Sequence, residues 1–194
     1  MALIDSHCHL DRDDYGKDRE AVIARAKAAG LRRAVLIGMW RKPGDFGEAL
    51  ELRDTDPAFF AATVGIHPHE AADAPEADFE LLAKLAATDR VVAVGETGLD
   101  YYYDHSPREV QQQAFRRQLK LAKDVRKPVV IHVRDAHDDC LRILKEEGVQ
   151  GGVIHCFTGG PEEAKGYLAQ GFHISVAGVV TSNPSSEATM SSAP

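Results

Sequence analysis

Residues 91–98 of this 194-residue chain read VVAVGETG. The four apolar residues 91–94 are typical of a strand that is buried on both faces of a parallel sheet. Gly95 follows this run, then Glu96, and Gly98 comes two residues later. A carboxylate at the end of a buried strand is costly unless it is paired or bound to a metal. The stretch therefore predicts a buried parallel strand that carries an acidic group at its carboxyl end.

Short apolar runs of this kind alternate along the chain with longer stretches of helical periodicity. That alternation is typical of βα units around a parallel sheet. Polar residues able to do chemistry come just after the apolar runs, as they do at the carboxyl ends of the strands of (β/α)8 barrels. We therefore predict an α/β fold, a TIM-type (β/α)8 barrel. The apolar runs are residues 2–4, 34–37, 59–64, 91–94, 129–131, 153–154 and 172–176, and helical stretches include 18–29, 79–86 and 108–126.

The barrel is expected to be incomplete at its carboxyl end. From His9 to Val176 the chain makes six steps of about 28 residues each, and eight such units need roughly 224 residues. Residues 181–194, TSNPSSEATMSSAP, are rich in Ser and Pro and show neither periodicity, so they cannot supply an eighth strand. The sequence predicts a hydrolase barrel of about seven βα units over residues 1–180 and an irregular tail over residues 181–194.

The composition argues against several classes of protein. Lys and Arg number 23 against 30 Asp and Glu, so the net charge is −7 and no global basic field draws the chain to nucleic acid or to an anionic membrane. Any contact with phosphate must be local or metal-mediated. No apolar run approaches the ~20 residues of a membrane span, and three cysteines are too few for a disulfide framework. We expect a cytoplasmic protein without membrane association.

Four histidines and one glutamate occupy successive predicted strand ends. His7 and His9 alternate along the first strand and so face one side, where two imidazoles can chelate a divalent metal. His132 and His155 each end an apolar run, and either one alone is most often a packed core histidine. One barrel mouth would gather all five groups, which as a set favour a two-metal hydrolytic centre. The predicted metal ligands are His7, His9, Glu96, His132 and His155.

Other side chains near these strand ends have more than one interpretation. Asp5 could orient a ligating histidine, whereas Cys8 is expected to pack. His67 and His69 flank a proline at the third strand end and are better placed to touch substrate than to complete a metal site. Arg134 could bind a phosphate with its forked guanidinium or form an ordinary surface ion pair. The loop after residue 100 could stack on bases or simply pack, and it contains Tyr101, Tyr102 and Tyr103.

Five motifs, in order, carry a resemblance to a known family. The chain resembles the TatD-like metal-dependent deoxyribonucleases, relatives of the amidohydrolase-type barrels, from residue 1 to about residue 181. Because all five motifs occur in the same order, the resemblance is highly specific. The motifs are DSHCH (5–9), GIHPH (65–69), GETGLD (95–100), IHVRDA (131–136) and HCFTG (155–159).

The resemblance implies hydrolysis of phosphodiester bonds in DNA with two divalent metal ions, and it implies that Glu96 bridges them. Imidazole ligands favour zinc or manganese over magnesium, while the resemblance implies magnesium-supported activity, so zinc, manganese and magnesium all stay open. The substrate implied is DNA, at ends or in single strands. The remaining ligands implied are His7 and His9 for one ion, and His132 and His155 for the other.

The resemblance also places His67 beside the scissile phosphate, which makes Glu96 and His67 the implied catalytic residues. Substrate contacts are expected from His67, His69 and Arg134. The family pattern continues to an eighth strand that ends in Glu-Thr-Asp, whose aspartate binds the first metal and orients the attacking water. This sequence has no such motif.

Two alternative functions stay open at this point. One is a hydrolase of the same fold that cleaves an ester, a lactone or an amide. The other is a catalytically impaired metal-binding remnant, because the eighth-strand aspartate is absent. The open edges of an incomplete barrel would also allow the chain to associate with itself.

Overall fold

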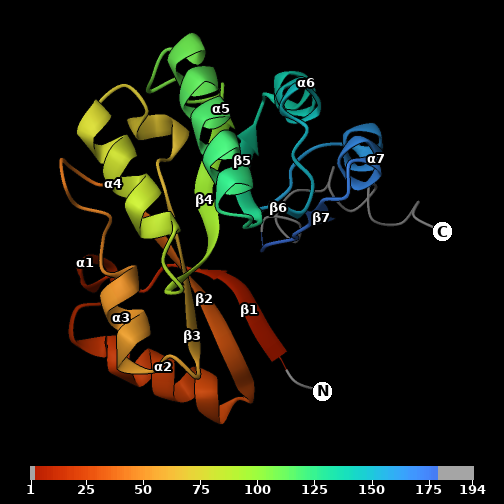
Figure 1. Ribbon diagram of the computed structural model, residues 1–194. Helices are drawn as coiled ribbons and strands as arrows, with labels where there is room; N and C mark the ends of the chain where they lie inside the picture. Colours follow the sequence, from red (N-terminus) through yellow and green to blue (C-terminus); the bar gives the residue numbers. More distant parts are fainter. Residues whose placement is uncertain (1–2, 179–194) are drawn as a thin grey trace.

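Seven parallel strands form one sheet that curls into an incomplete barrel (Figure 1). The computed structural model describes residues 3–178. The spatial order of the strands follows the chain order, and every neighbouring pair is parallel. The predicted α/β barrel of about seven units is thereby confirmed. The strands are β1 (Leu3–Cys8), β2 (Leu31–Met39), β3 (Phe60–Gly65), β4 (Val91–Asp100), β5 (Val129–Arg134), β6 (Gly152–Ile154) and β7 (His173–Ile174).

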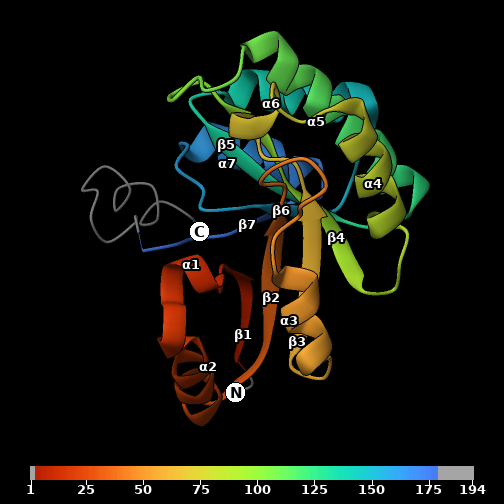
Figure 2. The same ribbon diagram turned by 90° about the vertical axis from the view of Figure 1, so that its left-hand side faces the viewer.

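Helices alternate with the strands and pack on one face of the sheet. Figure 2 shows α4 and α5 in the upper part of the molecule and α3 beside β2 and β3. Each longer helix contacts a strand that flanks it in sequence. The helices are α1 (Arg12–Tyr15), η1 (Gly16–Asp18), α2 (Arg19–Ala28), α3 (Ala49–Thr55), η2 (Pro68–Glu70), α4 (Glu76–Ala86), α5 (Arg108–Asp124), α6 (His137–Glu147) and α7 (Pro161–Ala169).

The central strands β3, β4 and β5 are buried along most of their length, as their continuous apolar runs predict. The larger cluster of buried side chains lies between sheet and helices and contains Leu36, Val94 and Phe115. A smaller cluster, Ile37 with Ala93 and Val130, comes from alternate positions of neighbouring strands. Because successive side chains of a strand point to opposite faces, this second cluster lies on the inner face of the curl.

The strand β4 runs six residues beyond the apolar run that predicts it, because glycines allow it to pair closely with β5. Thr97 pairs with Ile131, and Gly98 pairs with His132. A Cβ atom at Gly98, where φ is +145°, would collide with the carbonyl oxygen of His132. Only glycine fits this close approach, which sets Glu96 beside the end of β5.

Gly98→Ala should therefore destabilise the fold and displace His132. We expect a loss of about 2 to 3 kcal/mol in the free energy of unfolding, since the added methyl group meets backbone rather than a movable side chain. Urea denaturation measures this loss. Gly148→Ala is the matched control: Gly148 also has a positive φ of +62°, but nothing lies within 4 Å of its Cβ position. It should cost only about 1 kcal/mol. Equal losses in the two variants would contradict the proposed collision.

The strands β1 and β7 lie at the two ends of the sheet, and no pairing joins them within residues 3–178. In β1 the side chains of Leu3 and Ile4 are exposed. Self-association through these edges stays a prediction. The predicted tail of residues 181–194 lies outside the described residues. Across residues 3–178, every helix is too short or too polar to cross a lipid bilayer.

Candidate metal centre

The predicted ligands meet at one edge of the sheet. All strands are parallel, so their carboxyl ends share an edge, and each ligand lies in the carboxyl-terminal half of its strand or just after it. His7 is on β1, Glu96 on β4 and His132 on β5. His9 and His155 directly follow β1 and β6.

One group of donors gathers around His7. Its Nε2 atom lies 3.3 Å from Oε2 of Glu96 and 3.2 Å from Nε2 of His9. The ring of His155 stacks on that of His7, with centroids 3.3 Å apart and planes 10° from parallel. Ligand atoms of His7, Glu96 and His155 all lie within 4.8 Å of one another. We call His7, His9, Glu96 and His155 the first donor group.

The first donor group suits a divalent cation. Two ligand atoms on a tetrahedral zinc ion, with bonds near 2.1 Å, lie about 3.3 Å apart. The distances around His7 Nε2 match this separation. Nδ1 of His7 and Nδ1 of His155 are buried and lack a hydrogen-bond partner in the part of the chain that the structure describes. Nitrogen donors with one carboxylate oxygen are a set that zinc binds well.

Burial favours the neutral form of two imidazoles of this group, His9 and His155. Desolvation lowers the pKa of His155 to about 4. Desolvation and the neighbouring His7 also lower the pKa of His9. Neutral imidazole is the form that binds a metal, so at pH 7 both rings present a lone pair.

Glu96 stands between this group and a second one. Its side chain is only 5% exposed, and burial opposes its ionisation. Hydrogen bonds from His132 and His7 outweigh burial and hold the pKa of Glu96 well below its usual range. Oε2 faces His7, while Oε1 lies 3.3 Å from Nδ1 of His132. The carboxylate thus offers one oxygen to each side.

The second donor group consists of His67, His69 and His132, whose ligand atoms lie within 4.8 Å of one another. The ring centroids of His67 and His132 are 4.5 Å apart, and those of His67 and His69 are 4.4 Å apart. Pro68 begins η2 directly after His67, and this turn brings both rings of the motif to β5. The sequence predicts His67 and His69 as substrate contacts and His132 as a metal ligand; the structure places all three side by side.

Asp100, the last residue of β4, is a residue of this site that the sequence analysis missed. It is fully buried, and its Oδ2 atom accepts hydrogen bonds from Nε2 of His132 at 2.9 Å and Nε2 of His69 at 3.0 Å. Although burial opposes ionisation, hydrogen bonds from backbone and imidazole groups lower the pKa of Asp100 to about 2. Residues 96, 98 and 100 alternate along β4 and share one face. The alternation of these three positions along the strand is the sequence signal that could have identified Asp100.

Two buried glutamines of α5 hold the strand ends in place. Gln111 receives the backbone N–H of Asp100 at 2.8 Å and donates to its carbonyl at 3.0 Å. Gln118 does the same for Ile66, at 2.8 and 2.9 Å. Both glutamines are in phase with the predicted buried stripe of this helix, which is formed by Phe115, Leu119 and Ala122.

Asp5 does not act as expected. Its Oδ1 atom accepts the backbone N–H of His7 at 3.0 Å, whereas the ring atom Nδ1 of His7 has no hydrogen-bond partner in residues 3–178. Asp5 therefore fixes the chain just before His7 rather than its tautomer. Cys8 packs as predicted: its Sγ atom donates to the carbonyl of Val35, and burial raises the pKa of the thiol to about 12.

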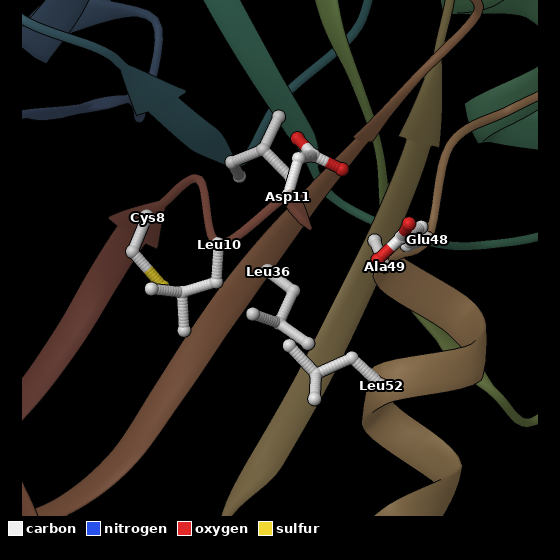
Figure 3. Close-up of a pocket in the computed structure, with 8 residues that line it drawn as sticks. Cys8, Leu10, Asp11, Leu36, Glu48, Ala49 and Leu52 are labelled. Carbon is white, nitrogen blue, oxygen red and sulfur yellow. The ribbon is translucent and has the colours of Figure 1, made fainter. Parts of the chain in front are cut away.

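Two cavities lie near β1. The one in Figure 3, between β1, β2 and α3, has a volume of about 10 Å³, which leaves room for at most a single water molecule. It cannot be a substrate site. A larger cavity of about 450 Å³ reaches the first donor group, and its lining includes His7, His9, His155 and, from α2, Val22, Ile23 and Ala26.

The fold and the donor groups together are those of a metal-dependent hydrolase. The model of the family "TatD related DNase" matches residues 4–193. The metal-dependent hydrolase YabD of Bacillus subtilis (strain 168) is 43% identical over 181 residues, which cover 92% of this chain and 70% of YabD. The 3'-5' ssDNA/RNA exonuclease TatD of Pantoea sp. (strain At-9b) is 36% identical over 180 residues, covering 92% of this chain and 68% of that protein.

A solved structure supports the same relationship. The crystal structure of YJJV, a TatD homologue from Escherichia coli k12, aligns with a TM-score of 0.88 and 30% identity, over 99% of this chain and 75% of that one. The chain belongs to the TatD-related DNase family.

Asp100→Asn should weaken metal binding without unfolding the chain. When a cation is bound, a carboxylate that accepts the Nε2 proton of His132 would leave the lone pair of Nδ1 available to that cation, and losing such a partner costs about 10- to 100-fold in metal affinity. Calorimetric titration with Zn²⁺ measures the loss. Asp104→Asn is the control, because Asp104 is exposed and pairs only with Arg108 among the described residues. Unchanged affinity in the Asp100→Asn variant would refute the orienting role.

Proposed function

We propose that this chain hydrolyses phosphodiester bonds of DNA, at ends or in single strands, with two divalent metal ions. The observation that carries the proposal is Glu96, which offers one carboxylate oxygen to imidazoles on either side. A carboxylate so placed can bridge two cations. The relative from Pantoea named as a 3'-5' ssDNA/RNA exonuclease supports a nucleic-acid substrate.

The residues on the two sides of Glu96 have different roles in this proposal. His7, His9 and His155 would hold one cation on one side of Glu96, and His132 would offer Nδ1 to a second cation on the other side. When bound, two such ions supply positive charge to the phosphoryl oxygens and lower the pKa of water. Glu96 fixes the spacing of the two sides, and Asp100 fixes the orientation of His132.

His67 is placed to donate a hydrogen bond to the substrate. Its Nδ1 atom accepts the backbone N–H of His69 at 3.3 Å, an arrangement that requires the ring to carry its proton on Nε2. In the proposed reaction this N–H binds a non-bridging oxygen of the scissile phosphate, where negative charge increases in the transition state. His69 supports the same region through its hydrogen bond to Asp100.

A nuclease assay tests the proposal. The purified chain should degrade a single-stranded oligonucleotide in the presence of Mn²⁺ or Mg²⁺, and a chelator should stop it. Glu96→Gln should lower the rate at least about 100-fold, since it removes the charge between the two sides. Glu162→Gln, at an exposed site on α7, is the matched control and should leave the rate unchanged.

Three results would overturn this function. Chelator-insensitive cleavage would indicate a contaminant. Hydrolysis of a lactone or carboxylic ester with none of DNA would favour the hydrolase alternative. Stoichiometric metal binding without turnover on either substrate would favour the metal-binding remnant.

The number of metal ions is tested separately. After loading with Zn²⁺ or Mn²⁺ and dialysis, elemental analysis should find two ions per chain. His9→Ala and His155→Ala should each lose about one ion, and Glu96→Gln should lose both, because its oxygens serve both sides. A single ion that survives Glu96→Gln would contradict a bridging carboxylate.

A further inference from the structure

Two exposed tyrosines follow β4 next to the second donor group. The side chains of Tyr102 and Tyr103 are 57% and 51% exposed. Their neighbour Tyr101 differs: it is half-buried and its hydroxyl donates to Asp139 at 2.8 Å. A structural role would bury the rings, as it does for Tyr101, so the exposed pair requires another explanation.

The backbone that carries these rings is fixed rather than free. The backbone N–H groups of Tyr102 and Tyr103 both donate to Oδ1 of Asp100, at 3.1 and 2.9 Å. Its other oxygen, Oδ2, binds His69 and His132. One buried carboxylate therefore positions the exposed rings and the imidazoles of the donor group together.

Arg134, at the end of β5, lies over the same rings. Its guanidinium carbon is 3.9 Å from the ring centroid of Tyr102 and 5.0 Å from that of Tyr103. Within residues 3–178 no carboxylate forms an ion pair with Arg134, so its charge is not neutralised by a neighbour of that kind. A guanidinium stacked on exposed rings favours π-faced, anionic ligands.

Ring contacts connect this surface with the metal centre. From His67 in the second donor group the path goes to His69, and from His69 to Tyr103, with centroids 5.5 Å apart. Tyr103 contacts Tyr102 at 4.8 Å and lies parallel to His105 at 5.5 Å. The exposed rings are thus the outer end of a series of edge-to-face ring contacts that begins at His67 in the second donor group.

We propose that Tyr102, Tyr103 and Arg134 form a stacking platform for an unpaired nucleobase of the strand whose phosphate lies at the metal centre. The inference rests on the proposed function. Every nucleobase has a π-face, so the platform binds without reading sequence, while a base inside a duplex has both faces covered by its neighbours. The platform therefore selects single strands and frayed ends.

The net charge of the chain explains why stacking would matter for its affinity for nucleic acid. Most proteins that bind nucleic acid gain affinity by neutralising phosphates with many basic side chains. This chain has a net charge of −7 and lacks that general attraction. Stacking on Tyr102 and Tyr103 supplies affinity that does not depend on a basic surface.

A binding experiment distinguishes the contribution of the nucleobases to affinity from that of the sugar-phosphate backbone. On the metal-loaded unsubstituted chain, fluorescence anisotropy measures Kd for a 5'-fluorescein-labelled phosphorothioate dT8, which resists cleavage, and for the same strand with abasic residues at its three 3'-terminal positions. The protein should bind dT8 at least about tenfold more tightly than the abasic probe. Adding Tyr102→Ala and Tyr103→Ala should weaken dT8 binding at least about tenfold and leave abasic binding unchanged.

Tyr102→Phe with Tyr103→Phe is the matched control, since it keeps the rings and removes the hydroxyls. It should bind dT8 within about twofold of the parent. The comparison of the two probes needs no change to the platform, so it stands even if the alanine variant does not fold. Equal Kd values for dT8 and the abasic probe, or equal binding by the folded alanine variant, would overturn the platform.

Failure of the platform and failure of the proposed function give different results. Hydrolysis of dT8 with ordinary phosphodiester bonds by the unsubstituted chain, together with equal affinity for both probes, would overturn only the platform. Base-dependent binding without hydrolysis would overturn the nuclease function and keep the platform as a binding site for single strands.

Discussion

The arrangement of the site depends on one buried carboxylate, Glu96, whose charge is stabilised by imidazoles on both sides. One of them, His7, comes from β1, which is separated from β4 by two strands. In a flat sheet these strands would lie roughly 14 Å apart, given about 4.8 Å between neighbours. The observed 3.3 Å between His7 Nε2 and Glu96 Oε2 exists only because the sheet curls. The stabilisation of the Glu96 charge by His7 therefore depends on the curvature of the sheet.

Much of this arrangement could be predicted from the sequence, because it follows from periodicity. Continuous apolar runs mark strands buried on both faces, and each of the seven runs coincides with or touches a strand. A parallel sheet collects all carboxyl ends at one edge, so residues such as His132 and His155 could be assigned to a common site without knowledge of distances. The convergence of His7 and His9 follows from alternation along β1.

The remaining features depend on loop conformation, which periodicity does not encode. The approach of His67 and His69 to His132 requires the turn at Pro68 and a particular length of loop after β3. The role of Asp100 depends on glycine pairing that extends β4 beyond its apolar run. The contact of Asp5 differs from the expected one. A carboxylate near a histidine can accept a hydrogen bond from its ring or from its backbone N–H, and periodicity does not distinguish these two contacts.

The position of β1 at one end of the sheet has a consequence for local stability. Whereas β4 pairs with strands on both sides, β1 pairs with β2 alone among residues 3–178 and exposes Leu3 and Ile4. Sub-global opening begins in such elements, so the amides of β1 should exchange with solvent well before those of β4. His7 and His9 belong to this weakly held segment, while Glu96 belongs to a strongly held one. Any ligand that bridges them ties an end strand of the sheet to an interior one, and its free energy of binding adds directly to the cost of releasing the amino-terminal strand.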